Sequence, residues 1–536
     1  MARRASWDVQ RSLPIALVVA LAVLLASCGS VEVFVTTDRS DRILDLGSDR
    51  SESTTTIADG TDPDDVPDAS DGPAATDDAP IDPADPEVDD PVDDEIDASA
   101  IDPNAIDFGS DKPPRDYDEF LLAALGDIDT WLKSEFEPAF GLPYRPLDGA
   151  VFAGYPERQD DLPGCGEPRT DYDDLQLFVA FYCPIGDFIV YDDGPDGLLA
   201  GLAREFGPAT IGIVLAHEYG HAVQQRTGAL ELSLPTVITE QQADCIAGAW
   251  AGRAASGLAS GIPFDDADIR AGLISMITVQ DPVGLDPAAA GGHGSGFDRV
   301  GAFQTGFDSD LGRCATLIED PLPLTPLSFL DVNDRLSGGN ATFGFAEGEL
   351  FGFLVPDLNL LFDNDLVAEF PEFTRLELVP TESADEIDCD EPFGLYPLGA
   401  ELCSENDTVY LNVPVARELY DDFGDFAPAY VLGLVWSEHA QRSNSSQLTG
   451  EARQLRNDCL TGAWVRSVTR DPQTGALPQP RDPDRQASVS PNDLTEAIQA
   501  AILIGDPTSD TDVLGTPFQK ISAFRDGALG SIVACS

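Results

Sequence analysis

The stretch "VLAHEYGHAVQQ", residues 214–225, holds two of the four histidines in this 536-residue chain. A Gly-Pro pair precedes the surrounding apolar segment and a glycine follows it, which predicts a helix of about five turns over 209–227. Side chains four residues apart leave the same face of a helix. His217 and His221 therefore lie one turn apart, and Glu218 projects beside them.

This H-E-x-x-H spacing offers two imidazoles to a borderline-soft cation such as Zn2+ and a carboxylate that can act on a water at the metal. The next predicted helix, 236–255, supplies a third candidate ligand, Glu240, with Asp244 on the same face. Two histidines and one glutamate leave one tetrahedral position open, as in peptidase sites and unlike closed structural sites. We expect Asp244 to accept a ring N–H from His217, or alternatively to pair with an arginine.

Residues 115–320 resemble the bacterial neutral zinc metallopeptidases, which belong with the gluzincins. The resemblance rests on "LAHEYGHAVQ", "EQQADCIAGAW", "FYCP" followed by "VYDD", and "HGSGFDRVGAFQTGF". It implies a zincin-like domain with His217, His221 and Glu240 as zinc ligands and Glu218 as general base. The chain departs from the family pattern at Ala222, where another histidine is usual, and this departure leaves the expected ligands untouched.

The expected chemistry is hydrolysis of a peptide bond. Zinc brings the pKa of its water towards neutrality, and Glu218 takes the proton as the oxygen attacks the carbonyl. His293, in "GGHGSG", is the candidate second donor to the developing oxyanion, because the glycines allow the backbone to approach closely. The alternative is that His293 is a loop histidine without a role.

The motifs of the first segment recur in the same order further along the chain, which indicates a tandem duplication. The paired stretches are "TIGIVLAHEYGH" with "VLGLVWSEHAQR", "ADCIAGAW" with "NDCLTGAW", "DIRAGLISMITVQDP" with "DLTEAIQAAILIGDP", and "FDRVGAFQTG" with "FQKISAFRDG". We therefore expect residues 330–536 to form a second, degenerate metallopeptidase-like domain.

The second copy lacks the expected site. The positions of the three ligands are occupied by Glu438, Arg442 and Gln454, the base position by His439, and the His293 position by Leu514. An arginine would repel a dication, so this domain is interpreted as a pseudoenzyme that grips substrate, covers the first copy or binds a partner. The alternative is a different metal held by His439 and nearby carboxylates.

Nine cysteines are present, and eight of them remain if Cys28 carries lipid. Sequence does not fix their connectivity, but the simplest pairing repeats between the copies. That pairing joins Cys165 with Cys183, Cys245 with Cys314, Cys389 with Cys403, and Cys459 with Cys535. Cysteine ligation of zinc is the alternative, although no C-x-x-C pair favours it.

The N-terminus has the pattern of a secretory signal, with arginines, a short apolar run and "LASC" ending at Cys28. This end resembles the lipobox of bacterial lipoproteins, which implies signal removal (1–28) and lipid on Cys28; the alternative is a plain signal peptide with an incidental cysteine. Residues 29–114 are rich in Asp and Pro and predict a disordered tether. A calcium site there is disfavoured because the glycine turn and spaced ligands of an EF-hand are missing.

With 30 basic and 96 acidic residues the formal charge is -66, which excludes nucleic acid as a ready partner. The resemblance to zinc metallopeptidases and the repeated motifs imply an α+β, mainly helical fold in two tandem domains. The expected protein is a membrane-anchored, extracytoplasmic zinc peptidase that acts on a protein or peptide substrate. The competing hypothesis is a non-catalytic binding or scaffold lipoprotein with a structural zinc site. Oligomeric state is not indicated.

Overall fold

The computed structural model describes residues 102–535, with gaps at 159–161, 260, 263, 286–290, 326–328, 330, 337, 340–344, 346–348, 390–397, 472–475, 480 and 507–512. The predicted signal peptide, Cys28 and the tether up to residue 101 lie outside the described residues. Among the residues that are described, no helix combines the length and the apolar character needed to cross a bilayer.

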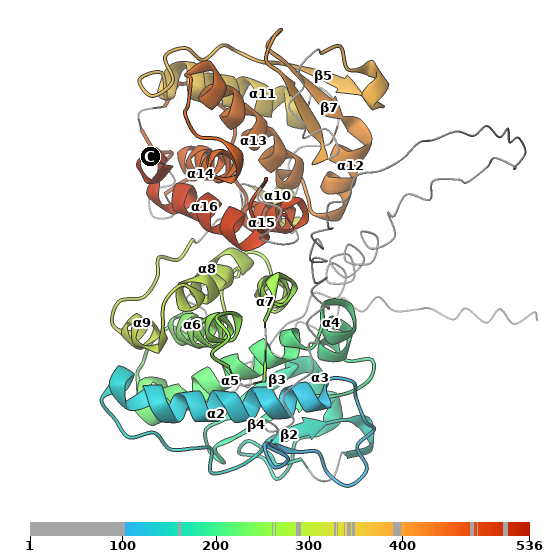
Figure 1. Ribbon diagram of the computed structural model, residues 1–536, viewed down its shortest axis with the longest axis vertical. Helices are drawn as coiled ribbons and strands as arrows, with labels where there is room; N and C mark the ends of the chain where they lie inside the picture. The colour runs from blue at the N-terminus through green and yellow to red at the C-terminus, as the bar shows by residue number, and fades with distance from the viewer. Residues whose placement is uncertain are drawn as a thin grey trace, which may run out of the picture.

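The chain has an α+β, mainly helical fold, as predicted, and its two halves lie one above the other in Figure 1. The first half contains a four-stranded sheet in the order β1-β2-β4-β3. The strands β1, β2 and β4 run parallel, whereas β3 is antiparallel to β4 and forms an edge. Their bounds are β1 Ile106–Asp107, β2 Val151–Gly154, β3 Ala180–Cys183 and β4 Phe188–Asp192.

Helices pack against this sheet and against one another. They are α2 Asp118–Phe140, α3 Tyr172–Phe178, α4 Leu198–Phe206, α5 Ala209–Thr227, α6 Thr236–Ala255, α7 Asp266–Thr278, α8 Gly296–Phe307 and α9 Leu311–Ala315, with 3-10 turns at Pro156–Arg158, Ala229–Glu231 and Thr316–Ile318. The bounds of α5 and α6 match the predicted helices. Gly228 ends α5 in the left-handed conformation at φ 79°, which suits glycine.

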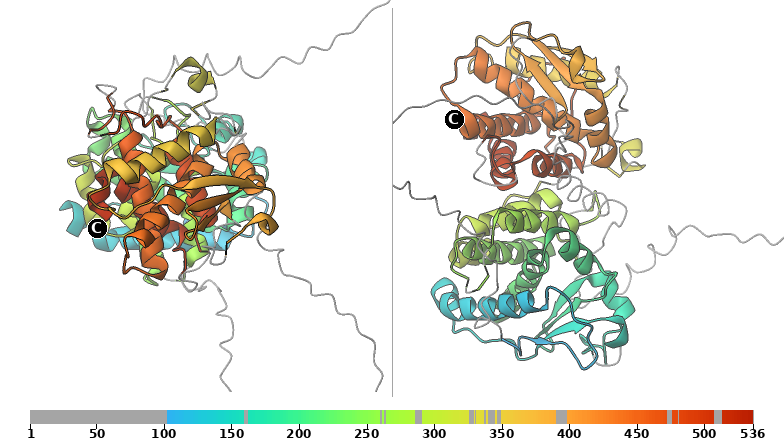
Figure 2. Two further views of the ribbon diagram at one scale, coloured as in Figure 1. Left: turned by 90° about the horizontal axis from the view of Figure 1, so that it is seen from above. Right: turned by 45° about the vertical axis from the view of Figure 1, so that its right-hand side comes forward.

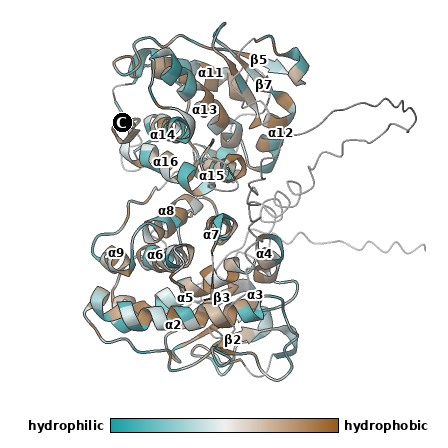
Figure 3. Ribbon diagram, viewed as in Figure 1, coloured by the Kyte–Doolittle hydropathy of each residue, from teal (hydrophilic) through white to brown (hydrophobic). Residues whose placement is uncertain are grey.

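The second half has its own three-stranded sheet, in the order β5-β7-β6. Its elements are α10 Val332–Leu336, α11 Leu350–Leu360, the π-helical turn Leu361–Asp365, β5 Glu377–Thr381, the 3-10 turn Ala384–Glu386, β6 Ala400–Cys403, β7 Thr408–Asn412, α12 Val413–Asp422, α13 Phe426–Ser443, α14 Gly450–Val468, α15 Asp493–Ile504, α16 Pro517–Gly530 and the 3-10 turn Ile532–Cys535. Figure 3 shows apolar ribbon in both halves, and buried apolar side chains of both halves join one core.

The two halves share local arrangements. In each sheet a parallel pair is followed by an antiparallel edge strand, β3 in the first half and β6 in the second. A Cβ on Gly248 of α6 would lie 1.9 Å from the carbonyl oxygen of Phe303 in α8. A Cβ on Gly462 of α14 would lie 2.0 Å from that of Phe524 in α16. Glycine therefore permits the same close approach of two helices in each half.

Four disulfides are formed, and they confirm the pairing that repeats between the two halves. They are Cys165–Cys183, Cys245–Cys314, Cys389–Cys403 and Cys459–Cys535. Because all eight of these cysteines are paired with each other, none offers a free thiolate to a metal.

The folded part of the chain begins before the expected end of the tether at residue 114. Ile106 is buried and its strand pairs with β2. Lys112 forms ion pairs with Asp118, at 2.7 Å, and with the fully buried Asp193, at 3.2 Å. Composition alone placed residues 102–114 in the tether, because a two-residue strand and one lysine carry too little hydrophobic pattern to stand out.

Candidate metal centre

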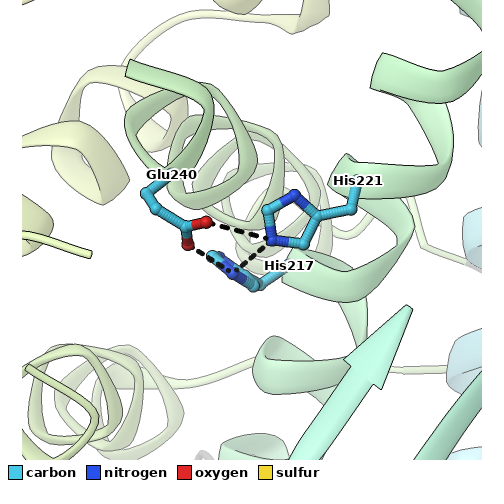
Figure 4. A group of neighbouring side chains, drawn as sticks. All are labelled: His217, His221 and Glu240. Carbon is cyan, nitrogen blue, oxygen red and sulfur yellow. Dashed lines mark hydrogen bonds and ion pairs between the residues drawn. The ribbon is translucent and has the colours of Figure 1, made fainter. Parts of the chain in front are cut away.

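The site depends on how closely α5 and α6 approach. Every residue of α5 from Ala209 to Gln224 is buried. A Cβ on Gly220 would lie only 2.7 Å from the Cα of Ala243 in α6, so glycine at this position lets the two backbones come together. The approach places Glu240 of α6 opposite the histidine face of α5 (Figure 4).

Three candidate ligand side chains converge there. The Nε2 atoms of His217 and His221 lie 3.1 Å apart. Glu240 places Oε2 at 3.2 Å from the Nε2 of His217 and Oε1 at 3.5 Å from that of His221. The three residues are 6%, 5% and 1% exposed, respectively. They form a compact, buried set of two nitrogens and a carboxylate.

The outer ring nitrogens are both held by other side chains. Nδ1 of His217 lies 2.7 Å from Oδ1 of Asp244, and Nδ1 of His221 lies 3.0 Å from Oε1 of Gln224. Gln224 is itself oriented by donating from Nε2 to the carbonyl of Thr239 at 2.6 Å. Since a carboxylate and an amide oxygen only accept, each Nδ1 is an N–H donor. This leaves both Nε2 lone pairs facing the centre.

Such an arrangement fits a cation. Two facing lone pairs repel each other unless a proton or a metal ion lies between them, and Zn2+ binds imidazole nitrogen and carboxylate oxygen. Within the described part of the chain, neither carboxylate oxygen of Glu240 accepts a hydrogen bond. A buried carboxylate without hydrogen bonds is costly, and a divalent ion held with His217 and His221 would compensate it.

The electrostatics favour the same conclusion. Burial would raise the pKa of Glu240, but attraction to His221, His293 and His217 holds that pKa well below its usual range. Burial lowers the pKa of His217, but the carboxylates of Asp244 and Glu240 outweigh this and raise it to about 10. The negative charge of Asp244 and Glu240 around His217 therefore favours a positive charge at this site, which a bound metal ion would supply.

Asp244 meets both expectations for it, because it contacts a ring nitrogen and also an arginine. Arg299 of α8 donates from Nε to Oδ2 at 3.0 Å and from Nη2 to Oδ1 at 2.7 Å. Asp244 is 0% exposed and Arg299 is 3% exposed. The attraction of Arg299 and His217 lowers the pKa of Asp244 although burial would raise it. Asp244 thus stays ionised and orients the ring of His217.

Glu218 and His293 line one cavity together with His217 and Arg299. Asp281 holds His293, with Oδ1 3.0 Å from the ring Nδ1 and Oδ2 accepting from the backbone N at 2.7 Å. Within the described residues the other ring nitrogen, Nε2, is buried and has no hydrogen-bond partner. The cavity therefore combines a carboxylate and a free imidazole nitrogen beside the candidate ligands.

The equivalent region of the second half is filled by protein groups. Glu438 is 0% exposed and accepts from Arg442 Nε at 2.5 Å, from Asn457 Nδ2 at 2.8 Å and from Arg453 Nη1 at 3.4 Å. Gln454 accepts from the same amide of Asn457 at 3.3 Å. Protein donors thus surround the position where the first half presents histidine nitrogens.

His439 faces a different environment from Glu218, whose position it takes. Its Nε2 lies 3.0 Å from Oγ1 of Thr374 and 3.8 Å from Oδ1 of Asp407. In the part of the chain that the structure describes, His439 belongs to no group of three candidate ligands. The other two such groups are Cys389, Cys403 and Glu405, which contains a disulfide, and the all-carboxylate group Asp425, Asp493 and Glu496.

Sequence reasoning did not name three residues that hold the site. Gln224 orients His221, Arg299 orients Asp244, and Asp281 orients His293. Two of them had a usable signal in the repeats, because a basic residue and an aspartate recur there as Lys520 and Asp506. Gln224 had no such signal, since only the packing of α5 on α6 gives its side chain a role.

Three relatives align with the chain over 175 residues at 30% identity, and all are uncharacterized proteins of Mycobacterium bovis and of two strains of Mycobacterium tuberculosis. The alignment covers 28% of this chain and 58% of each relative. No protein-family model matches the chain. No solved structure matches it either.

Proposed function

We propose that the first half is a zinc-dependent peptidase and that His217, His221 and Glu240 hold the metal. The single observation that carries this proposal is the convergence of both Nε2 atoms and the hydrogen-bond-free Glu240 carboxylate in one buried site. When bound, zinc supplies Lewis acidity, which makes water acidic enough to lose a proton near neutral pH. Three ligands leave a tetrahedral position open, which supports catalysis over a purely structural role.

The residues of the chain have distinct tasks in this proposal. Glu218 accepts a proton from water at its carboxylate and returns it to the leaving amine. In this role His293 carries a proton on both ring nitrogens: Nδ1–H donates to Asp281, which keeps the ring in place, and Nε2–H donates to the carbonyl oxygen as negative charge develops there. The cavity that these groups share has an apolar wall formed by Phe178, Val179 and Val214.

We further propose that the second half is a degenerate copy of the first and has lost its metal site. The repeated motifs, the repeated disulfides and the matching close approaches of α6 to α8 and α14 to α16 support a duplication. The Glu438–Arg442 ion pair at 2.5 Å supports loss of the site, because the protein's own cation neutralises the buried carboxylate.

The proposed location is the outer face of a membrane, reached by secretion and lipid attachment at Cys28. Four disulfides are typical of an oxidising compartment, which supports export. Metabolic labelling with a fatty acid should mark the wild type and should not mark Cys28→Ser. Label retained by that variant would contradict the anchor.

Peptide-library cleavage tests the peptidase proposal. We expect the full-length chain to cleave, to lose activity with a chelator and to regain it with Zn2+. Glu218→Gln should keep zinc and lose about 10²-fold or more in turnover, which is the usual contribution of a general base. Glu205→Gln in α4 is the matched control and should remain active. Bound zinc without cleavage of any peptide would favour the alternative, a non-catalytic binding or scaffold lipoprotein with structural zinc.

A further inference from the structure

The two halves contact each other through α8 and α16, the helices that share the repeated motif "FDRVGAFQTG" and "FQKISAFRDG". Gln304 of α8 donates from Nε2 to the carbonyl of Phe518 in α16 at 2.9 Å. Arg525 of α16 donates from Nη1 to the carbonyl of Phe297 in α8. Gln304 and Arg525 occupy the same position of the motif, as do Phe297 and Phe518. The contact is therefore reciprocal.

The neighbouring helices also contact the opposite half reciprocally. The helix α7 contacts α16, and its counterpart α15 contacts α8. Ile277 of α7 and Ile502 of α15 line one cavity between the halves. Figures 1 and 2 show these helices meeting along the boundary of the two halves. In an interface with two-fold symmetry, each contact between two positions occurs twice, once in each direction. The two halves therefore pack as the two subunits of a symmetric dimer do, although they belong to one chain.

The reciprocal contact is chemically unequal, because one side is an amide and the other is a guanidinium. Arg525 is 9% exposed, and its guanidinium carbon lies 4.2 Å from the centre of the Phe297 ring. A Cβ on Gly301 would lie 1.7 Å from Nη2 of Arg525, so only glycine leaves room for the charge. Burial lowers the pKa of Arg525 to about 10, with attraction to Asp298 acting in the opposite direction, and Arg525 remains a cation at neutral pH.

This cation lies against the helix that supports the metal centre. Phe297 and Gly301, which it contacts, lie on either side of Arg299 in α8. Arg299 in turn holds Asp244, and Asp244 holds His217. We propose that Arg525 is a positioning residue, contributed by the second half, that fixes α8 and through it the His217 ring of the first half. This proposal depends on the proposed function in one respect only, which is that His217 is a ligand of a metal centre.

The four histidines of the chain provide a direct test. Ring Cε1 resonances are measured in the full-length chain with selectively labelled histidine, first without metal and then with Zn2+. Arg525→Gln introduces glutamine, the residue at the equivalent position 304 of the first half. It should shift the His217 and His293 signals and leave the signal of His439, in the second half, unchanged. Gln304→Met, the matched control, breaks the reciprocal bond and should leave His217 and His293 where they are.

Zinc affinity is measured on the same samples by competition with a chromophoric chelator. Loss of a group that contacts a ligating side chain directly weakens metal binding about 10–100-fold. Because Arg525 acts through Arg299 and Asp244, we expect a smaller loss, up to about 10-fold, for Arg525→Gln and no loss for Gln304→Met. Arg525→Lys keeps the charge and should recover part of the loss. Equal effects of Arg525→Gln and Gln304→Met, or no shift at His217 in either, would overturn the proposal.

Two further outcomes separate this proposal from the proposed function. If the wild type binds no zinc while the His217 and His293 shifts occur as expected, the positioning role stands and the metal assignment fails. If Arg525→Gln does not fold, Arg525→Lys is decisive, because lysine is shorter and lacks the planar fork of the guanidinium, and it should therefore still move His217 and His293 relative to His439. Unchanged spectra of that variant would contradict the proposal.

Discussion

Replacing Asp244 by asparagine should lower both the stability of the first half and the affinity of the proposed site for zinc. Asp244 lies 2.7 Å from Nδ1 of His217 and accepts two bonds from Arg299. Asparagine keeps the shape and removes the charge, so Arg299, 3% exposed, is left as an uncompensated buried cation. Breaking a buried ion pair from one side costs about 3–5 kcal/mol of unfolding free energy. Loss of the partner of a ligating histidine weakens metal affinity about 10–100-fold.

Asp458→Asn is the matched control, because Asp458 takes the place of Asp244 in the second half. It is 0% exposed and accepts from Lys520 Nζ at 2.9 Å and from the hydroxyl of Tyr430. Both variants should lower the midpoint of denaturant unfolding, measured on metal-free protein. Only Asp244→Asn should weaken zinc binding in chelator competition. If the two variants change zinc affinity by the same factor, the argument that Asp244 acts through His217 is wrong.

Three more predictions concern packing, crosslinking and catalysis. Gly220→Ala should cost about 1–3 kcal/mol of stability and weaken zinc binding, because the new methyl group would lie 2.7 Å from the backbone of α6. The control is Gly201→Ala in α4, where the methyl group would meet open space. In thermal unfolding this control should be neutral or stabilising. The double variant Cys245→Ser and Cys314→Ser removes a disulfide that closes a loop of sequence separation 69, and it should lower the unfolding free energy by about 4 kcal/mol. A loss of less than about 1 kcal/mol in chemical denaturation would contradict this. His293→Gln should keep full zinc content and lower kcat about 10²–10³-fold for peptide cleavage, and unchanged kcat would remove His293 from the mechanism.

Much of the site could be predicted from sequence because its signals are local. A Gly-Pro pair before α5, a glycine after it and a proline before α6 indicate where these helices begin and end. The helical spacing within these bounds then determines which side chains share a face. The contact between His217 and Asp244 could be expected since a ligating histidine needs an acceptor for its other nitrogen. The disulfides followed from the repetition of cysteine spacing between the halves.

The groups that escaped prediction depend on contacts distant in sequence. Arg299 reaches Asp244 from a helix 55 positions away, and Arg525 reaches Phe297 across 228 positions. No periodicity encodes such pairs, although the motif alignment put Arg299 and Lys520 at one position. The start of the folded part was also missed, since a two-residue strand at Ile106 gains its stability from pairing with β2 and from burial, neither of which is visible in composition.

The central claim is that one zinc ion is held by His217, His221 and Glu240. X-ray absorption at the zinc edge, combined with metal content by mass spectrometry, tests it on the full-length chain. The account predicts one zinc per chain with imidazole nitrogen and oxygen ligands, lost in His217→Ala and in Glu240→Ala and retained in Glu438→Ala. Absence of zinc from the wild type, sulfur in its coordination shell, or full zinc content in Glu240→Ala would contradict the account.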